Sequence, residues 1–339
     1  EVGGWSSMRA AIESMGGQFS THFTILLPNT HSEFPWSGIV FGLGVVLAIA
    51  YMSGNQAIVH RTLGARTEWD AKAGMLLGGF MKSFIPVMVA LPGLCALVYL
   101  PHAIQNDPNA VPAEMYQMVD TESGPVPVLN ERDRVVPTMM RLMLPPGLQG
   151  LMLAGLLAAL MSSISGTLSS ASTIFVTDIY NRGRQLFGFK ALNEKSALYW
   201  GRGFTAFLII ASSLLAPQFD RVDGLYNFIQ TVLSLFQGPT LAILLLGILW
   251  PRANRWGALT GLLLGVLFCF AMWCVPNLFP AEDPFLYIAM YSFLFALVVT
   301  VVVSLLTPPE PEEKIRGLVW SSVVQDPAAQ AALNARIEA

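Results

Sequence analysis

The sequence predicts an all-α integral membrane protein, and three observations support this fold class. Hydrophobic residues fill 54% of the 339 positions and charged residues only 12%, whereas soluble proteins have about 25% charged residues. Several stretches reach the roughly 18 to 25 apolar residues that a helix needs to cross a bilayer. Short segments rich in proline, glycine and charge separate these stretches.

Seven membrane spans can be drawn in chain order. They cover residues 37–53, 73–100, 148–180, 198–217, 225–249, 256–278 and 285–307. The third is too long for one bilayer thickness, so we expect it to tilt or to project into water at one end.

Lysine and arginine residues set the expected orientation, because cytoplasmic loops near membrane spans carry the positive excess. Thirteen of them fall in alternate loops and the C-terminal tail, and five fall on the other side, where the loop 101–146 also holds six acidic residues. We therefore expect a multi-pass protein of the plasma membrane or bacterial inner membrane, with its N-terminus outside and its C-terminus in the cytoplasm.

The net charge, the cysteines and the start of the chain limit which partners are expected. The net charge of -3 argues against nucleic acid as a partner. The three cysteines all fall in apolar spans and are interpreted as small hydrophobic residues; they are Cys95, Cys269 and Cys274. The chain begins at Glu1 without an initiator Met or a signal peptide pattern. Because its first residues are expected outside, we expect earlier transmembrane helices of the same protein to precede them.

The first span runs apolar up to Tyr51 and continues as "MSGNQAIVHR". Gly54 and Asn55 come where a helix could continue, and unwound backbone at membrane depth is tolerated only in a protein interior or beside a watery cavity. A helix that simply ends at the inner surface explains the same residues. Both interpretations stay open at this point.

The second span contains Lys82. A lysine deep in the membrane costs about 2.5 to 3.5 kcal/mol, so it needs a partner or a water-filled neighbourhood. A buried charge pair that locks helices would satisfy it, but a functional role is favoured. Pro86 and Pro92 predict kinks in this span.

In the fifth span, Asn227 and Gln230 share one helical face. Their amides can bind a neutral polar ligand or join two helices.

The segment "LMSSISGTLSSASTIFVTDIY", residues 160 to 180, carries many hydroxyls in an apolar span. Most of them are interpreted as small packing residues that return a hydrogen bond to their own helix. Ser162 and Ser163 differ, because two adjacent hydroxyls near the carbonyl of Ala159 could form half of a cation site. Transporters hold monovalent cations with neutral oxygens of this kind near the midplane.

The order of residues adds a resemblance. The run "PPGLQGLMLAGLLAALMSSISGTLSSASTIFVTDIY" resembles the signature helix of the sodium/solute symporter family. "NQAIVHRTLGA" resembles the motif D-Q-V-I-V-Q-R-x-L of its sodium/glucose cotransporter (sugar/inositol) branch, and "FIQTVLSLFQGP", "LWPRANRWGALTGLLLG" and "LLTPPEPEEKIRGLVW" resemble later segments of that branch. The likeness covers most of residues 36–320.

The resemblance implies a fold of two inverted five-helix repeats, of which this chain would hold the second. It implies an outer loop, a second repeat with an inserted outer loop, two further helices and a cytoplasmic tail; these are 1–36, 37–249 with 101–146 inserted, 250–307, and 308–339. The first repeat would lie in the missing N-terminal helices.

The resemblance also implies site residues. Ala159, Ser162 and Ser163 match the signature-helix part of the main sodium site, whose other ligands are carbonyls of the first core helix. For the substrate, Tyr51, Lys82 and Gln230 match positions of the sugar branch, and Asn55 stands where an Asp is common; these four are the candidate substrate residues. Met52 replaces a Trp and His60 a Gln, so the solute stays open between a hexose, myo-inositol and another polyol.

The implied function is symport of sodium, the coupling ion, with a small polar solute, most simply a sugar or polyol, by alternating access in the lipid bilayer. A sodium symporter for an amino acid, carboxylate or sialic acid is an alternative, and so is a transporter-like sensor without net transport. An enzyme is not expected, because the four histidines are scattered; they are His22, His31, His60 and His102.

Overall fold

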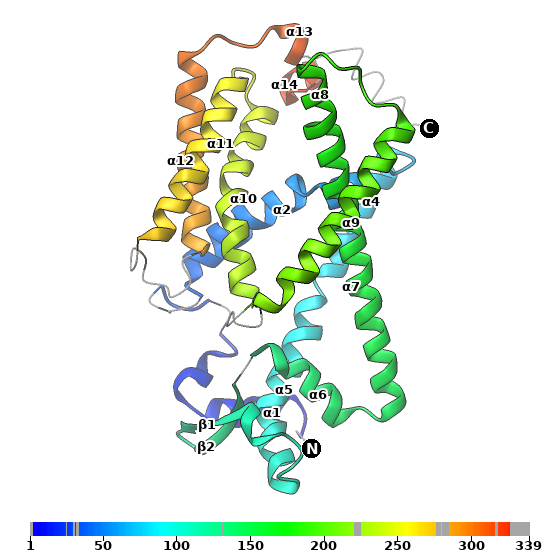
Figure 1. Cartoon of the computed structure of the whole chain (residues 1–339). Helices are drawn as coiled ribbons and strands as arrows, with labels where there is room; N and C mark the ends of the chain where they lie inside the picture. Colours follow the sequence, from blue (N-terminus) through cyan, green and yellow to red (C-terminus); the bar gives the residue numbers. More distant parts are fainter. Residues whose placement is uncertain are drawn as a thin grey trace. The chain divides into compact units, whose positions relative to one another are not determined.

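The structure is a computed structural model in which helices dominate (Figure 1). It describes residues 3–24, 26–29, 31, 34–130, 132–219, 225–275, 279, 285–315 and 318–325. Among these residues, six helices are long and apolar enough to cross a membrane, and one bent pair brings the number to seven. The predicted all-α membrane fold with about seven spans is thereby confirmed. Residues 276–278 of the predicted sixth span lie outside the described residues.

The chain divides into two compact units. Unit 1 comprises residues 1–23 and 76–225, and unit 2 comprises residues 24–75 and 226–339. One of the boundaries between them, at residues 75 and 76, falls within helix α4 (Glu68–Lys82). The repeat boundaries expected from the resemblance stay a prediction.

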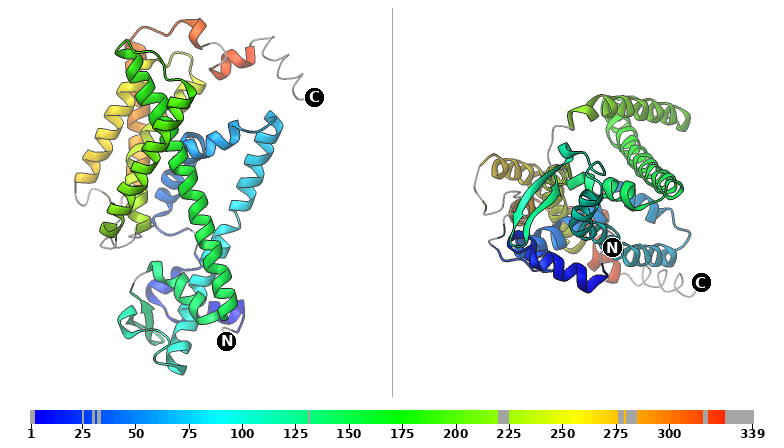
Figure 2. Two further views of the ribbon diagram at one scale, coloured as in Figure 1. Left: turned by 45° about the vertical axis from the view of Figure 1, so that its right-hand side comes forward. Right: turned by 90° about the horizontal axis from the view of Figure 1, so that it is seen from below.

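The N-terminal residues of unit 1 and its residues 85–143 carry regular structure of their own. The elements are α1 (Trp5–Ser14), the 3₁₀-helix η1 (Gly17–Thr21), α5 (Ile85–Asn106), η3 (Ala113–Met115), β1 (Tyr116–Thr121), β2 (Gly124–Leu129), η4 (Arg132–Arg134) and α6 (Val135–Met143). The strands form an antiparallel hairpin that pairs Tyr116 with Leu129. Figure 2 shows α1 (blue) beside this hairpin (teal).

Two apolar clusters hold these elements of unit 1 together. Met8 and Ile12 of α1 pack with Val126 of β2, and Leu94 and Val98 of α5 close this cluster. A second cluster joins α5, β2 and α6 through Ala96, Leu100, Leu129 and Met139. The segments predicted as loops, 1–36 and 101–146, therefore contain regular structure, because their apolar residues form a shared core with α5.

The predicted third span is a single long helix. It runs without interruption over Pro146–Leu186, 41 residues, or about 60 Å at 1.5 Å per residue. This confirms that it exceeds one bilayer thickness. The helix consists of α7 (Pro146–Ile174), a π-helical segment η5 (Phe175–Asn181) and α8 (Arg182–Leu186). At its start, the amide of Gln149 donates to the carbonyls of Arg141 (3.0 Å) and Leu144 (2.7 Å), which fixes the turn from α6.

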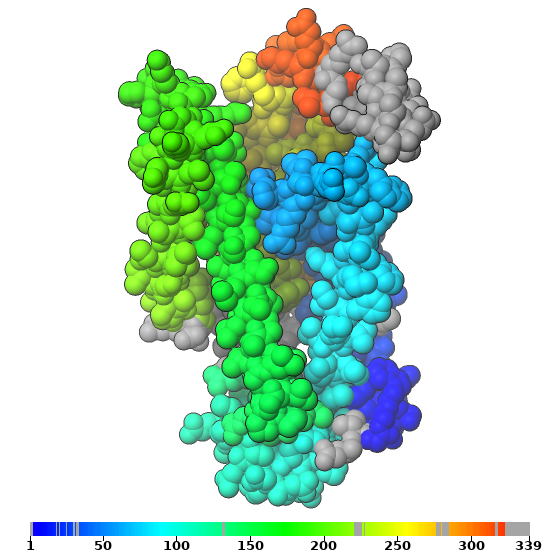
Figure 3. Space-filling view, turned by 90° about the vertical axis from the view of Figure 1, so that its right-hand side faces the viewer, coloured from blue at the N-terminus to red at the C-terminus, as the bar shows by residue number. Residues whose placement is uncertain are grey.

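Helix α9 (Glu194–Phe219) packs on the second half of that long helix. The Ser172 hydroxyl donates to the Gly201 carbonyl at 2.9 Å. Phe175 stacks on Phe204 with ring centroids 3.9 Å apart. Figure 3 shows the long helix (green) with α9 (yellow-green) beside it.

Unit 2 contains the remaining spans. They are η2, a π-helix (Gly38–Leu47), α2 (Ala48–Gly54), α3 (Gln56–Leu63), α10 (Leu225–Leu249), α11 (Arg255–Cys274) and α12 (Phe285–Leu306), with short α13 (Glu312–Ile315) and α14 (Trp320–Gln325). Val46 and Ala50 pack with Leu241 of α10 and Leu286 of α12 in one buried cluster. Helix α10 continues through Pro239, where the sequence suggests a kink.

The tightest helix pair is α11 with α12. Gly257 and Gly261 face Ser304 and Thr300 so closely that a Cβ at either glycine would collide with these side chains. Small residues allow such an approach between membrane helices, where packing rather than the hydrophobic effect drives association.

Candidate functional site

The first predicted span is broken at Asn55. Helix α2 ends at Gly54, Asn55 has extended backbone angles (φ -80°, ψ 111°), and α3 begins at Gln56. The two helices are bent by 53° at this point. The helical backbone is therefore interrupted at Asn55 and resumes at Gln56, as a broken helix requires.

The Asn55 side chain itself stabilises the break. Its Oδ1 accepts a hydrogen bond from the Ala57 backbone N–H at 2.9 Å. Asn is among the preferred residues at this capping position, because the first N–H groups of a helix have no partner within it. The sequence reasoning missed this role, although an Asn directly before "QAIVHR" is a recognised start signal for a helix.

Helix α10 lies against the break in unit 2. A Cβ on Gly54 would lie 3.5 Å from Leu244 Cδ1 and 3.7 Å from Thr240 Cγ2. Tyr51, in the last turn of α2, is 39% exposed. The structure thus brings Tyr51 and Asn55 together on one broken span, next to the second half of α10.

Gln230 lies in the same unit but near the start of α10. It is half-buried, and its Nε2 donates to the Tyr226 hydroxyl at 3.4 Å. About three helical turns separate it from Leu241, which packs on α2. Gln230 therefore lies about three turns of α10 away from the part of that helix that packs on α2, whereas Tyr51 and Asn55 lie on the broken span itself.

Lys82, in unit 1, lies at a second interruption. It is the last residue of α4, and α5 begins at Ile85. Between them, the N–H groups of Ser83 and Phe84 bond to the carbonyls of Phe80 (3.1 Å) and Met81 (3.2 Å), so the backbone turns without unwinding. The Lys82 side chain is exposed at this joint.

The hydroxyls of the long helix fall into distinct groups. Four of them donate to carbonyls one turn back in the same helix, at 2.7 to 3.0 Å; they belong to Thr167, Ser170, Thr173 and Thr177. Ser172 instead bonds across to α9. The prediction that most hydroxyls satisfy the helix or its packing is confirmed for these five.

Ser162 and Ser163 belong to a further group, together with Ser165 and Ser169, whose side chains are exposed and bond to none of the described residues. Ala159 is exposed as well. Residues three and four apart in a helix share one face, so α7 brings Ala159, Ser162 and Ser163 together on its surface.

This arrangement suits a monovalent cation. Its donors are uncharged oxygens, which is the ligand chemistry of sodium sites in transporters. The described parts of the chain contain no group of three or more His, Cys, Asp or Glu residues that could hold a metal ion. Two hydroxyls cannot enclose a cation alone, so the three residues supply at most one side of the predicted site.

Comparisons with known proteins agree with these features. A sequence profile of the "Sodium:solute symporter family" matches residues 1–265. The chain is 32% identical over 317 residues to sodium/myo-inositol cotransporter 2 of Oryctolagus cuniculus, covering 89% of this chain and 45% of that protein. It is 32% identical over 305 residues to sodium/glucose cotransporter 1 of the same species, covering 85% and 44%.

A sodium/mannose cotransporter of Bos taurus is likewise 32% identical over 311 residues, covering 87% of this chain and 50% of that protein. The chain thus spans about half the length, or slightly less, of the curated relatives it matches. The profile match covers well over half of the 339 residues. The chain therefore belongs to the sodium:solute symporter family.

Proposed function

We propose that this chain is part of a sodium-coupled symporter that carries a sugar or polyol across a membrane by alternating access. The names of the relatives, which pair sodium with myo-inositol, glucose or mannose, support this class of solute. The observation that carries the proposal is that Ala159, Ser162 and Ser163, which match the family's sodium motif, lie on one exposed face of α7 with both hydroxyls unpartnered among the described residues.

In this proposal Ala159, Ser162 and Ser163 form the signature-helix side of the sodium site. Helices of a first repeat, in the remainder of the full-length protein, complete it with backbone carbonyls. Residues 37–249 form the second five-helix repeat, residues 250–307 add two helices, and residues 308–339 form a cytoplasmic tail. The N-terminus of the chain lies outside, in agreement with the distribution of Lys and Arg over the loops of the whole chain.

The solute contacts assigned here are Tyr51, Asn55, Lys82 and Gln230. The exposure of Tyr51 beside a helix break supports its assignment, because transporters bind substrates where helices are interrupted. Lys82 is assigned from its match to the family's sugar branch, and its exposure at the α4–α5 joint supports the assignment. These residues hydrogen-bond a neutral polyhydroxylated solute and carry no covalent chemistry, so the protein is a transporter and not an enzyme.

Coupling requires that sodium and solute bind better together than alone. A coupling free energy of about 1 to 3 kcal/mol, a 5- to 150-fold change in affinity, is typical. The membrane potential adds about 2.3 kcal/mol per charge per 100 mV, so inward sodium movement drives the solute inward.

Sodium-dependent uptake of labelled myo-inositol by the full-length protein in proteoliposomes tests the proposal. Ser163→Ala should raise the sodium concentration for half-maximal uptake by at least about fivefold. Ser170→Ala is the matched control, because its hydroxyl already bonds to the Gly166 carbonyl at 2.9 Å. An unchanged sodium dependence in Ser163→Ala would remove the sodium assignment.

A panel of labelled sugars, polyols, amino acids, carboxylates and sialic acid tests the solute class in the same vesicles. Uptake restricted to sugars or polyols supports the proposal. Sodium-dependent uptake of another class alone would overturn the solute assignment, and sodium binding without uptake of any solute would indicate a sensor.

A further inference from the structure

An open groove of about 870 Å³ runs between the long helix and α9, entirely within unit 1. Its lining surface is mainly apolar, with Leu168 and Val176 on one helix and Ala206 and Ile209 on the other, and the long helix also contributes Ser and Thr side chains. This volume lies within the range of ordinary ligand sites. None of the candidate sodium residues, Ala159, Ser162 and Ser163, lines it.

One cation, Arg202, lies in the groove wall. Its side chain is exposed, and within the described residues it has no hydrogen bond or ion pair. Residues 203–219 of α9 carry no charge after it, and residues 146–177 of the long helix carry none before Asp178. Arg202 therefore marks the level at which the apolar part of the groove meets the polar surface.

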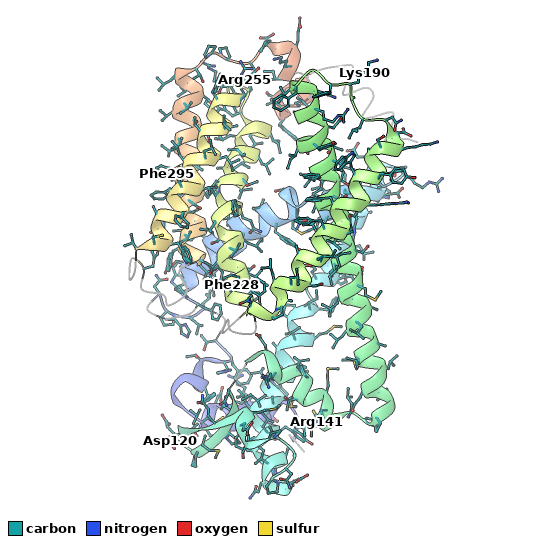
Figure 4. All side chains as sticks on the ribbon, viewed as in Figure 1. Asp120, Arg141, Lys190, Phe228, Arg255 and Phe295 are labelled. Atoms are coloured by element: carbon teal, nitrogen blue, oxygen red, sulfur yellow. The ribbon has the colours of Figure 1, made fainter. Side chains whose placement is uncertain are left out.

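The surface beyond this end of the groove is basic and aromatic. Between residues 181 and 205 there are five basic residues, Arg182, Arg184, Lys190, Lys195 and Arg202, against one acidic residue, Glu194. Asp178, just before this segment, is the nearest other opposing charge along the chain. Figure 4 places Lys190 in the connection between α8 and α9.

Large side chains project from the same segment. Phe187 is 83% exposed, Tyr199 is 74% exposed, and the ring of Trp200 lies tilted against that of Tyr180 with centroids 4.5 Å apart. Arg184 is already engaged, because its guanidinium lies over the rings of Tyr180 and Phe189 at 5.9 and 5.6 Å. Exposed Trp and Tyr beside Lys and Arg are typical of the headgroup level of a membrane.

We propose that this groove binds one anionic phospholipid, with an acyl chain along the apolar walls and the phosphate of the headgroup at Arg202. Charge complementarity selects this occupant. An apolar groove with an unpaired guanidinium about one helical turn from its end, next to a basic surface, matches an amphiphile with a negative head. Anionic lipids are enriched in the cytoplasmic leaflet, which is the side assigned to this segment by its positive charge.

The site does not depend on the transport function, so it can be tested by binding alone. The full-length protein in detergent is mixed with phosphatidylglycerol or phosphatidylcholine of identical acyl chains, and retained lipid is counted by native mass spectrometry. We expect phosphatidylglycerol to be retained in preference. Inorganic phosphate added without lipid should not bind, because the apolar walls contribute most of the contact.

Three variants locate the site. Arg202→Gln should lower the preference for phosphatidylglycerol about fivefold, the effect of one basic residue near an anionic membrane surface, and Arg202→Lys should retain it. Ala206→Trp fills the groove and should lower retention of both lipids. Arg141→Gln is the matched control, because Arg141 is exposed at the opposite end of the long helix (Figure 4).

Three outcomes would overturn the proposal. They are equal retention of the two lipids, an equal effect of Arg202→Gln and Arg141→Gln, and unchanged retention in Ala206→Trp. The last would indicate that another part of the protein covers the groove. Unchanged melting temperatures of the variants in detergent exclude unfolding as the cause of lost binding, and Arg202→Lys tests the charge if Arg202→Gln does not fold.

Discussion

Removing the cap of α3 at Asn55 separates two ways in which this residue can serve transport. Its Oδ1 accepts from the Ala57 N–H and holds the 53° bend, while its amide nitrogen can donate to a solute. Asn55→Ala removes both groups. Asn55→Asp and Asn55→Ser keep an acceptor for the cap but lose the amide.

The structure sets the size of the expected effect. Loss of an N-cap costs about 0.5 to 2 kcal/mol, which changes the population of the bent state by about 2- to 30-fold. If only the bent state binds solute, the half-saturating solute concentration rises by up to that factor. We therefore expect Asn55→Ala to raise it by about 2- to 30-fold, and Asn55→Asp and Asn55→Ser to raise it less.

The assay is sodium-dependent uptake of labelled myo-inositol by the full-length protein, measured over a range of solute concentrations. Asn254→Ala is the control, because Asn254 caps α11 through the Gly257 N–H at 2.9 Å, away from the broken span. It should lower the melting temperature but leave the half-saturating concentration unchanged. Equal impairment in Asn55→Asp and Asn55→Ala would refute the capping role, since Asp keeps the acceptor.

Two further predictions concern helix packing, and both are checked by thermal unfolding of the protein in detergent. Gly261→Ala should destabilise the protein by about 1 to 3 kcal/mol, because the new Cβ would collide with Thr300. Gly247→Ala, in open space on α10, should stabilise it by up to about 1 kcal/mol; a fall of equal size in both would refute the close α11–α12 contact. Ser172→Ala should cost about 0.5 to 1.5 kcal/mol by removing the bond to Gly201, and an unchanged melting temperature would show that this bond adds nothing.

Hydropathy predicted the spans well, because the requirement for about 20 apolar residues acts on the sequence directly. The excess length of the third span was visible in the same way, as an apolar run that is too long for one bilayer, whereas the residues around Asn55 allowed both a break and an end of the helix. These features depend on neighbouring residues in the chain.

The π-helical segments could not be predicted. In η2, Gly38 and Gly42 lie against Leu286 of α12, and a Cβ on Gly42 would collide with the Leu286 carbonyl. Contacts with a residue so distant in sequence are absent from any local pattern. The packed outer elements were missed for the same reason, since Met8 of α1 meets Val126 only in the folded chain.

The hydroxyls of the long helix show why candidate sites need the structure. Ser162, Ser170 and Ser172 are the same residue type in one apolar span, and the sequence separated the first from the others only by its neighbours. In the structure, Ser170 bonds to its own helix, Ser172 bonds to α9, and Ser162 bonds to nothing described. A hydroxyl without a partner in an apolar setting retains its full capacity to bind a ligand.

The hydrogen bond from Ser172 to Gly201 and the stack of Phe175 on Phe204 also fix the long helix to α9. Ser162 and Ser163 lie only about two to three turns from this junction along one continuous helix. Any movement of the long helix that releases an ion at these hydroxyls must therefore carry α9 with it, or break those contacts. A lipid held between the two helices would oppose their separation, so its binding should stabilise α7 and α9 as one moving element.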